Sequence, residues 1–233
     1  MAIQIDFTEH DAKKLLFGLI FGEVCLASIF VVESLLGKPV PEIHALLDLD
    51  GEANIPAWFS SIQLFMVGAL LLLIRRGGNA RYLPSRLFQR IVGLGFLFFS
   101  LDEVAMIHER ITESLKHLQW IPHFKGGHGI WIPLYFTIGV VVSFAMYRDI
   151  RTMWRYFRRQ TAIIVTGFTM YVAGAVVLET IGYEFLDAVP IKYIGGAEAV
   201  LEEFLEMSGV SVILYGVILY ALRTTDATSD SGS

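Results

Sequence analysis

The stretch ANIPAWFSSIQLFMVGALLLLI, residues 53–74, carries no charged side chain and decides the fold class of this sequence. A helix needs about 20 apolar residues to cross the hydrocarbon core of a bilayer, and this stretch meets that length. Residues 129–147 and 160–178 are two further runs without a charged side chain. The whole chain is 55% hydrophobic and 18% charged, which is more apolar than soluble domains usually are. The sequence therefore predicts an integral membrane protein of the all-α class.

Three other segments are long enough to span only if ionisable side chains are tolerated inside them. They interrupt their apolar runs with glutamate, aspartate or histidine. With these segments included, we predict a polytopic bundle of six transmembrane helices in a single membrane domain, residues 1–223: approximately 15–36, 54–74, 89–109, 130–147, 161–181 and 200–222. Residues 224–233 are rich in Ser, Thr and Asp and are predicted to form a disordered tail.

Arginines set the predicted orientation. The 75–90 connection holds five arginines and no acid, and the 148–159 connection holds five arginines and one acid, Asp149. Short connections rich in Lys and Arg stay in the cytoplasm. Both termini are therefore predicted to be cytoplasmic, and the protein is expected to be a multi-pass protein of the cell membrane.

Composition and residue types exclude several functions. A net charge of −5 without a basic groove argues against a nucleic-acid partner. Cys25 is the only cysteine, which excludes an internal disulfide framework and a Cys-based zinc site. His108 is the one histidine within a predicted span, so a haem held by two intramembrane histidines is excluded. The sequence also has no Gly-Lys-Ser/Thr loop for a nucleotide.

The most informative motif is SLDEVAMIHE, residues 100–109, at the outer end of the third predicted helix. Asp102, Met106 and Glu109 follow one another at spacings of four and three, so a continuous helix would align them in one stripe. A charged side chain at the centre of a span costs about 2.5–3.5 kcal/mol on insertion scales, which favours a functional role for these acids. The alternative is that the helix ends near Leu101 and the remainder is a solvated extension.

The second motif is EAVLEEFLEM, residues 198–207, at the outer end of the sixth predicted helix. Glu198, Glu202 and Glu206 repeat every four residues and would form one stripe. Like charges this close cannot all ionise in a low-dielectric site, so protons, a cation or a basic side chain must neutralise them. The alternative is an amphipathic helix start with solvated acids.

Three further glutamates lie in the predicted spans. Glu33 and Glu179 lie near the outer ends of their predicted helices. Each could belong to an intramembrane site, or its side chain could instead extend to water at the membrane surface. Glu23 lies near mid-membrane and is predicted to be protonated and hydrogen-bonded to a neighbouring helix, with a proton relay as the alternative. We expect the acid-bearing helices one, three, five and six to share one interior, with helices two and four as lipid-facing supports.

These patterns lead to the hypothesis of an outward-facing intramembrane carboxylate/histidine site that binds a divalent metal ion and can act on a lipid or a small apolar substrate. Oxygen-rich ligation with one histidine suits iron, manganese or calcium better than copper. The predicted ligands are Asp102, Glu103, His108, Glu109, Glu202, Glu203 and Glu206, with Glu33 and Glu179 as additional members.

Two other classes of function remain open. The same carboxylates would serve a cation- or proton-coupled transporter. A non-catalytic subunit of a larger membrane complex would use the acidic outer face to dock a basic extracytoplasmic partner. Membrane lipid is an expected partner in every case, and other membrane subunits are expected in the last. The sequence leaves open whether the protein is an enzyme.

The predicted orientation can be tested with reporter fusions. Fusions after residues 80, 155 and 228 are expected to report the cytoplasm because they follow the arginine-rich connections or the last span. Fusions near residues 45, 120 and 190 are expected to report the opposite side. An extracytoplasmic C-terminus would contradict the orientation.

Overall fold

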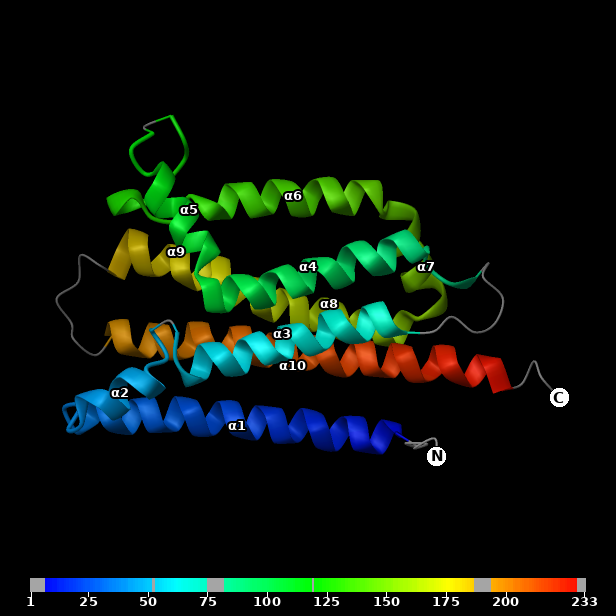
Figure 1. Ribbon diagram of the computed structural model, residues 1–233, viewed down its shortest axis with the longest axis horizontal. Helices are drawn as coiled ribbons and strands as arrows, with labels where there is room; N and C mark the ends of the chain where they lie inside the picture. The colour runs from blue at the N-terminus through cyan, green and yellow to red at the C-terminus, as the bar shows by residue number, and fades with distance from the viewer. Residues whose placement is uncertain (1–6, 52, 75–81, 119, 187–193, 230–233) are drawn as a thin grey trace.

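The computed structural model describes residues 7–51, 53–74, 82–118, 120–186 and 194–229 (Figure 1). These residues form helices joined by short connections, and the described part of the chain contains no strand. The all-helical prediction is thus confirmed. The helices are α1 Glu9–Leu35, α2 Pro41–Leu47, α3 Ile55–Leu73, α4 Arg86–Ala105, α5 Ile107–Leu115, α6 Trp131–Ala145, α7 Tyr147–Tyr156, α8 Arg158–Val172, α9 Glu179–Ile181 and α10 Ile194–Ser229. A 3-10 turn, η2, covers Lys125–Gly127, and two π-helical segments, η3 and η4, cover Ala173–Leu178 and Gly182–Leu186.

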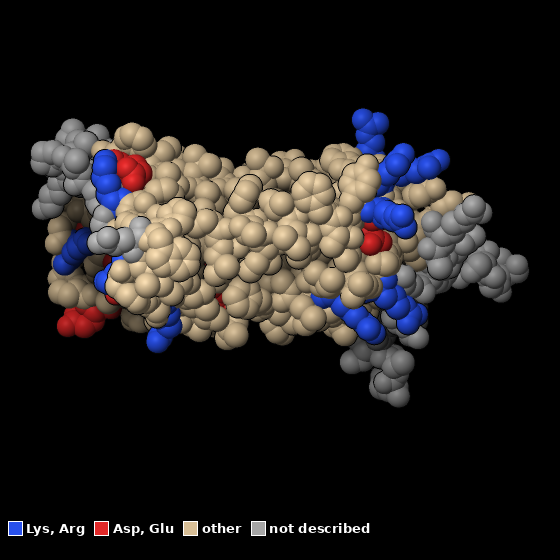
Figure 2. All heavy atoms as spheres, turned by 90° about the horizontal axis from the view of Figure 1, so that it is seen from above, with Lys and Arg blue, Asp and Glu red and all other residues tan. Residues whose placement is uncertain are grey.

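Helix length and composition fit a membrane. Four helical segments are long and apolar enough to cross one, and the number rises to six if the bent pairs α4/α5 and α6/α7 each count as one span. The long helices run along a common axis, and the start of α1 and the end of α10 lie at the same end of the bundle (Figure 1). Figure 2 shows a broad belt without Lys, Arg, Asp or Glu between two charged ends, with most of the visible Lys and Arg at that same end.

Helix α10 is the centre of the bundle. It contacts α1, α3 and α8, and 61% of its apolar stretch is buried inside the protein, against 17% for α1. Val210, Ile213 and Val217 of α10 pack with Leu64 and Val67 of α3 in the main core cluster. The helix extends beyond the predicted sixth span at both ends. Its last turns include residues 224–229 of the predicted tail, and residues 230–233 lie outside the described part.

Glycines bring the backbones of α8 and α10 into direct contact. A Cβ atom at Gly167 would lie 2.5 Å from the Gly209 carbonyl oxygen, and one at Gly209 would lie 2.6 Å from the Tyr171 amide nitrogen. Gly68 of α3 and Gly93 of α4 approach each other's carbonyl oxygens in the same way. Small residues at helix interfaces are how membrane helices gain close packing, because apolar side chains alone do not distinguish a neighbour from lipid.

The two predicted helices without a charged side chain, the second and the fourth, differ in how deeply they are buried. Helix α6 has no buried residue, as expected of a lipid-facing support. Helix α3, in contrast, buries nine residues, among them Ser60, Ser61 and Gln63. The prediction that helix two is a lipid-facing support is therefore wrong. Its small and polar side chains fit into the interior between α4 and α10, where they find hydrogen-bond partners.

The 148–159 connection is mostly helical. After Met146 the chain turns by 69° into α7, whose sequence YRDIRTMWRY places arginines at this end of the bundle. Asp149 accepts a hydrogen bond from the Ser85 hydroxyl at 3.0 Å and another from the Ser85 backbone N–H. Since Ser85 is also the N-cap of α4, this contact holds α7 against the start of that helix.

Gly209→Ala is expected to lower the free energy of unfolding by about 1–3 kcal/mol, because the added methyl group meets backbone atoms that cannot move aside. Gly95→Ala is the matched control, since nothing lies within 4 Å of a Cβ atom there. SDS-titration unfolding of both purified variants measures the difference. Equal midpoints for the two variants would contradict the close α8–α10 contact.

Candidate acidic site

A kink separates α4 from α5 in the middle of the SLDEVAMIHE motif. Met106 has a left-handed conformation, with φ 55° and ψ 42°, and α5 leaves at 70° to α4. This conformation costs about 1–2 kcal/mol for a residue other than glycine, so surrounding contacts must hold it. The prediction of a continuous helix over 89–109 is therefore wrong, and Asp102 and Glu109 do not share one helical stripe.

Two side chains hold the kink from opposite sides. The Asp102 Oδ1 atom of α4 accepts a hydrogen bond of 2.8 Å from the His108 backbone N–H, in the first turn of α5. In return, Arg110 Nε of α5 donates to the Ala105 carbonyl oxygen, the last of α4, at 3.0 Å. Each helix end thereby gains a partner for a backbone group that its own helix leaves unsatisfied.

Asp102 also links α4 to α6. Its Oδ2 atom accepts a hydrogen bond of 3.1 Å from the Tyr135 hydroxyl, and its Oδ1 atom lies 3.1 Å from His108 Nδ1. The Trp131 ring packs against both the His108 and the Tyr135 rings, with centroid distances of 5.4 and 5.3 Å. Asp102 is buried and well supplied with donors, so it has a structural task that the sequence hypothesis did not assign.

Acids of two helices lie within electrostatic range of the Tyr171 side chain of α8. Asp102 and Glu103 come from α4, Glu203 and Glu206 come from α10, and all four act electrostatically on the Tyr171 hydroxyl. We call this set the acidic site: Asp102, Glu103, Glu203 and Glu206 around Tyr171. It joins the two sequence motifs, which lie about one hundred residues apart in the chain.

Glu206 packs against Gly174 of η3, and the charged groups that act on it are acids. The neighbouring groups that act most strongly on its carboxyl group are Glu203, Glu103, Glu202 and Glu179, all of them acids. Gly174 leaves room for the Glu206 side chain, because a Cβ atom on residue 174 would lie only 2.7 Å from Glu206 Cγ. Gly174 belongs to η3, and π-helical segments of this kind occur often at functional sites.

The five predicted ligands outside the acidic site divide into three groups. Glu202 and Glu179 border the acidic site through their electrostatic action on Glu206, and Glu179 accepts a hydrogen bond of 3.3 Å from Trp131 Nε1. His108 contacts Asp102, whereas Glu109 is exposed on α5. Glu33 of α1 is the third case, because its Oε2 atom lies 3.4 Å from Nδ1 of His44 in α2. Within the described ranges, no three His, Cys, Asp or Glu side chains are arranged to hold a metal ion.

Glu23 is separate from the acidic site. Its carboxyl group is fully buried and accepts hydrogen bonds from Gln63 Nε2 of α3 at 2.9 Å and from Ser211 Oγ of α10 at 2.6 Å. The expected hydrogen bond between Glu23 and a neighbouring helix is confirmed. Glu23 of α1 thus contacts α3 and α10, and Glu33 of α1 lies beside His44; the expectation that the acids of helices one, three, five and six share one interior stays a prediction.

Sequence reasoning missed the neutral members of these networks. Tyr135, Tyr171, Gln63 and Ser211 carry no charge at neutral pH, so a search for intramembrane charges passes over them. A signal did exist for Gln63, because a side-chain amide in the middle of a charge-free span needs a hydrogen-bond partner on another helix. For Tyr171 the sequence offers no such signal.

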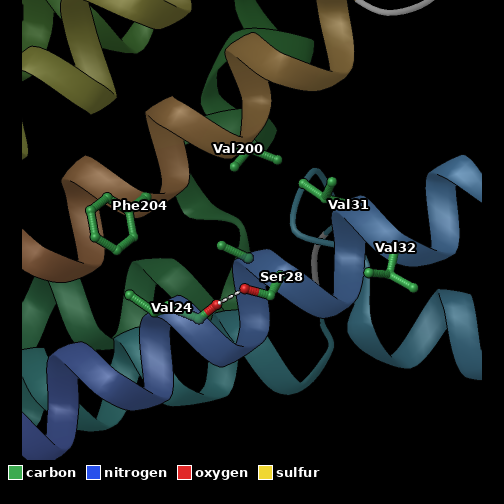
Figure 3. A pocket seen from close by; sticks show the side chains of 7 residues that line it. Val24, Ser28, Val31, Val32, Val200 and Phe204 are labelled. Carbon is green, nitrogen blue, oxygen red and sulfur yellow. Dashed lines mark hydrogen bonds between the residues drawn. The ribbon is translucent and has the colours of Figure 1, made fainter.

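An apolar groove of about 390 Å³ runs between α1 and α10 (Figure 3). The Ser28 hydroxyl lies in this groove but donates to the Val24 carbonyl oxygen at 2.6 Å, so its hydrogen is already used. The groove thus presents hydrocarbon, as a surface beside a lipid acyl chain would. It is lined by Val24, Ala27, Ser28, Val31, Val32, Val200 and Phe204.

The described part of the chain is an all-helical bundle with four to six segments that are long and apolar enough to cross a membrane. Its acidic site brings together acids from several of these segments. Residues 18–220 match the model of a family described as a domain of unknown function, DUF8692. Because this match covers most of the chain, the protein belongs to that family. No curated protein and no solved structure matches the chain.

Asp102→Ala is expected to lower the free energy of unfolding by about 1–3 kcal/mol, because it leaves the His108 backbone N–H and the Tyr135 hydroxyl without their acceptor. Asp102→Asn should cost less, since its amide oxygen can still accept from the His108 backbone. Glu109→Gln, an exposed position on α5, is the control and should change stability by no more than about 0.5 kcal/mol. An Asp102→Ala variant as stable as the control would contradict the role of Asp102 in the kink.

Proposed function

We propose that this protein is a multi-pass protein of the cell membrane with six spans and cytoplasmic termini, and that its acidic site takes protons or a cation from the extracytoplasmic side. The six-span count treats each bent pair, α4/α5 and α6/α7, as one crossing. The arginine-rich end of the bundle, where α1 begins and α10 ends, supports the cytoplasmic placement of both termini.

The crowding of acids around Glu206 is the observation that carries the proposal. Glu103 of α4 and Glu203 of α10 act on Glu206 together with Glu202 and Glu179. Neighbouring carboxyl groups in a low-dielectric membrane site cannot all be ionised unless protons or a cation intervene. The basic side chains described near this end contact other groups: Arg110 the Ala105 carbonyl, Lys116 the carboxylate of Glu113, and Lys125 the carboxylate of Glu184.

The two halves of the bundle differ in a way that supports an outward-facing site. The acids lie toward the end opposite the arginines, while the main core cluster fills the interior beyond Glu206 on the arginine side with side chains such as Val210, Ile213 and Val217. Ions do not enter a packed apolar interior without a large desolvation cost. Protons or cations would therefore enter and leave the site from outside, as in the outward-facing state of a coupled carrier.

A divalent metal ion is the second candidate ligand, and the Asp102–His108 pair favours it. Their Oδ1 and Nδ1 atoms lie 3.1 Å apart and would supply one oxygen and one nitrogen ligand, which suits iron, manganese or calcium. A third ligand would have to come from Glu103 or the α10 acids by a local rearrangement. The apolar groove beside α1 would then offer room for a lipid substrate.

Thermal unfolding of the purified protein separates these ligands. If protons neutralise the acidic site, stability should fall as the pH is raised, because the protons leave and the carboxylates repel one another. Glu206→Gln removes one of these charges and should weaken the pH dependence, whereas Glu109→Gln should leave it unchanged. In that case, adding a chelator or divalent metals should not shift the thermal unfolding midpoint of the wild type or of Glu206→Gln.

A metal-dependent midpoint in the wild type that Glu206→Gln abolishes would favour the metal ion over protons. Uptake by proteoliposomes under an imposed pH gradient tests the carrier function directly. If neither pH nor metals distinguish wild type from Glu206→Gln, the proposed site is wrong.

A further inference from the structure

Glu23, Gln63 and Ser211 form a closed polar group in the middle of the bundle, where α1, α3 and α10 meet. Glu23 and Gln63 are 0% exposed and Ser211 is 1% exposed. The residues around them are apolar: Leu64 and Val210, the chain neighbours of Gln63 and Ser211, belong to the main core cluster. We refer to the three residues as the Glu23 triad.

Every hydrogen that the triad side chains can donate is already used. Gln63 Nε2 donates one hydrogen to Glu23 Oε1 at 2.9 Å and the other to Ser211 Oγ at 2.9 Å. The Ser211 hydroxyl donates to Glu23 Oε1 at 2.6 Å. Gln63 has only two amide hydrogens and Ser211 only one, so no further donor remains in the group.

Two acceptors of the triad remain without a donor. Glu23 Oε2 and Gln63 Oε1 are both buried and have no hydrogen-bond partner within the described part of the chain. Buried polar atoms in folded proteins almost always have a partner, and leaving one unpaired costs about 1–3 kcal/mol. Both atoms lack the same thing, a hydrogen, and they belong to side chains that already share one hydrogen bond.

We propose that the Glu23 triad is a proton-binding site, in which Glu23 is a neutral carboxylic acid whose Oε2–H donates to Gln63 Oε1. One proton then satisfies both unpaired atoms and completes a two-way acid–amide pair between α1 and α3. Turning the Gln63 amide by 180° does not remove the need for it, since the amide oxygen would then face Glu23 Oε1 and a hydrogen would be required between those two oxygens.

The surroundings of the triad favour a proton over a permanent charge. Glu23 is fully buried, and the side chains with described hydrogen bonds to it, Gln63 and Ser211, are both neutral. On the packed helices, the nearest acid along α10 is Glu206, five residues before Ser211, and α3 contains no acid or base. An ionised carboxylate there would be a buried charge without a counter-ion, which is far more costly than a neutral acid.

The proton has a structural consequence because α1 is the least buried of the unbent candidate spans. The triad supplies the described side-chain hydrogen bonds that join α1 to α3 and α10 in the middle of the bundle. Binding of the proton therefore strengthens the attachment of α1. This inference does not depend on the ligand of the acidic site.

Infrared spectroscopy of the full chain in lipid nanodiscs at neutral pH tests the proposal. The difference spectrum between wild type and Glu23→Gln is expected to show the loss of one C=O stretching band of a protonated carboxylic acid. Glu42→Gln, an exposed position on α2, is the matched control and should leave that band in place. Loss of an ionised carboxylate band in Glu23→Gln would overturn the proposal, and so would a protonated band that appears only after sodium is removed.

Stability gives a second and independent readout. The Gln side chain reproduces the neutral acid, since its Nε2–H can donate to Gln63 Oε1 while its Oε1 accepts from Gln63 and Ser211. Glu23→Gln should therefore unfold at the wild-type midpoint, whereas Glu23→Ala, which strands the donors of Gln63 and Ser211, should unfold at a clearly lower one. A Glu23→Gln variant that fails to fold or unfolds as early as Glu23→Ala would show that a charge, and not a proton, is required at this position.

Discussion

The close contact between α8 and α10 is the constraint on which the acidic site depends. Gly167 of α8 and Gly209 of α10 let the two backbones touch, and Gly174 of η3, seven residues after Gly167, continues the same contact along α10. Tyr171 follows Gly167 by about one turn of α8, and its backbone lies against Gly209, so this contact places Tyr171 beside α10. A larger residue at any of these glycines would push Glu206 away from Tyr171. The glycines therefore determine the site although none of them carries its chemistry.

The kink at Met106 determines which acids of the third predicted helix join that site. Asp102 and Glu103 precede the kink and act electrostatically on Tyr171, while Glu109 follows the kink and is exposed on α5. The 20 residues of α4 correspond to about 30 Å of helix, and the chain then bends by 70° into α5. The left-handed residue thus redirects the chain shortly after Asp102 and Glu103.

The sequence was sufficient to predict the helical class and the apolar segments, because the cost of burying charge can be summed along the chain. It also singled out Asp102, Glu103, Glu203 and Glu206, since intramembrane acids are conspicuous. It could not predict the bend at Met106, which depends on contacts of Asp102 and Arg110 with helix ends. Nor could it predict that α3 is buried and α6 is not, because neither helix contains a charged side chain. The small and polar residues of α3, such as Ser61 and Gln63, are what place that helix inside.

The position of Glu23 has a consequence for how the membrane voltage acts on the protein. In the proposed orientation, a proton that reaches Glu23 from outside crosses roughly half of the transmembrane field, because the apolar core separates the triad from the cytoplasmic end. A full crossing changes the energy of a unit charge by about 2.3 kcal/mol per 100 mV, so half of it amounts to about 1 kcal/mol, or roughly a fivefold change in occupancy. A more negative cell interior would draw the proton in and tighten the packing of α1, which makes the attachment of one helix a function of membrane potential.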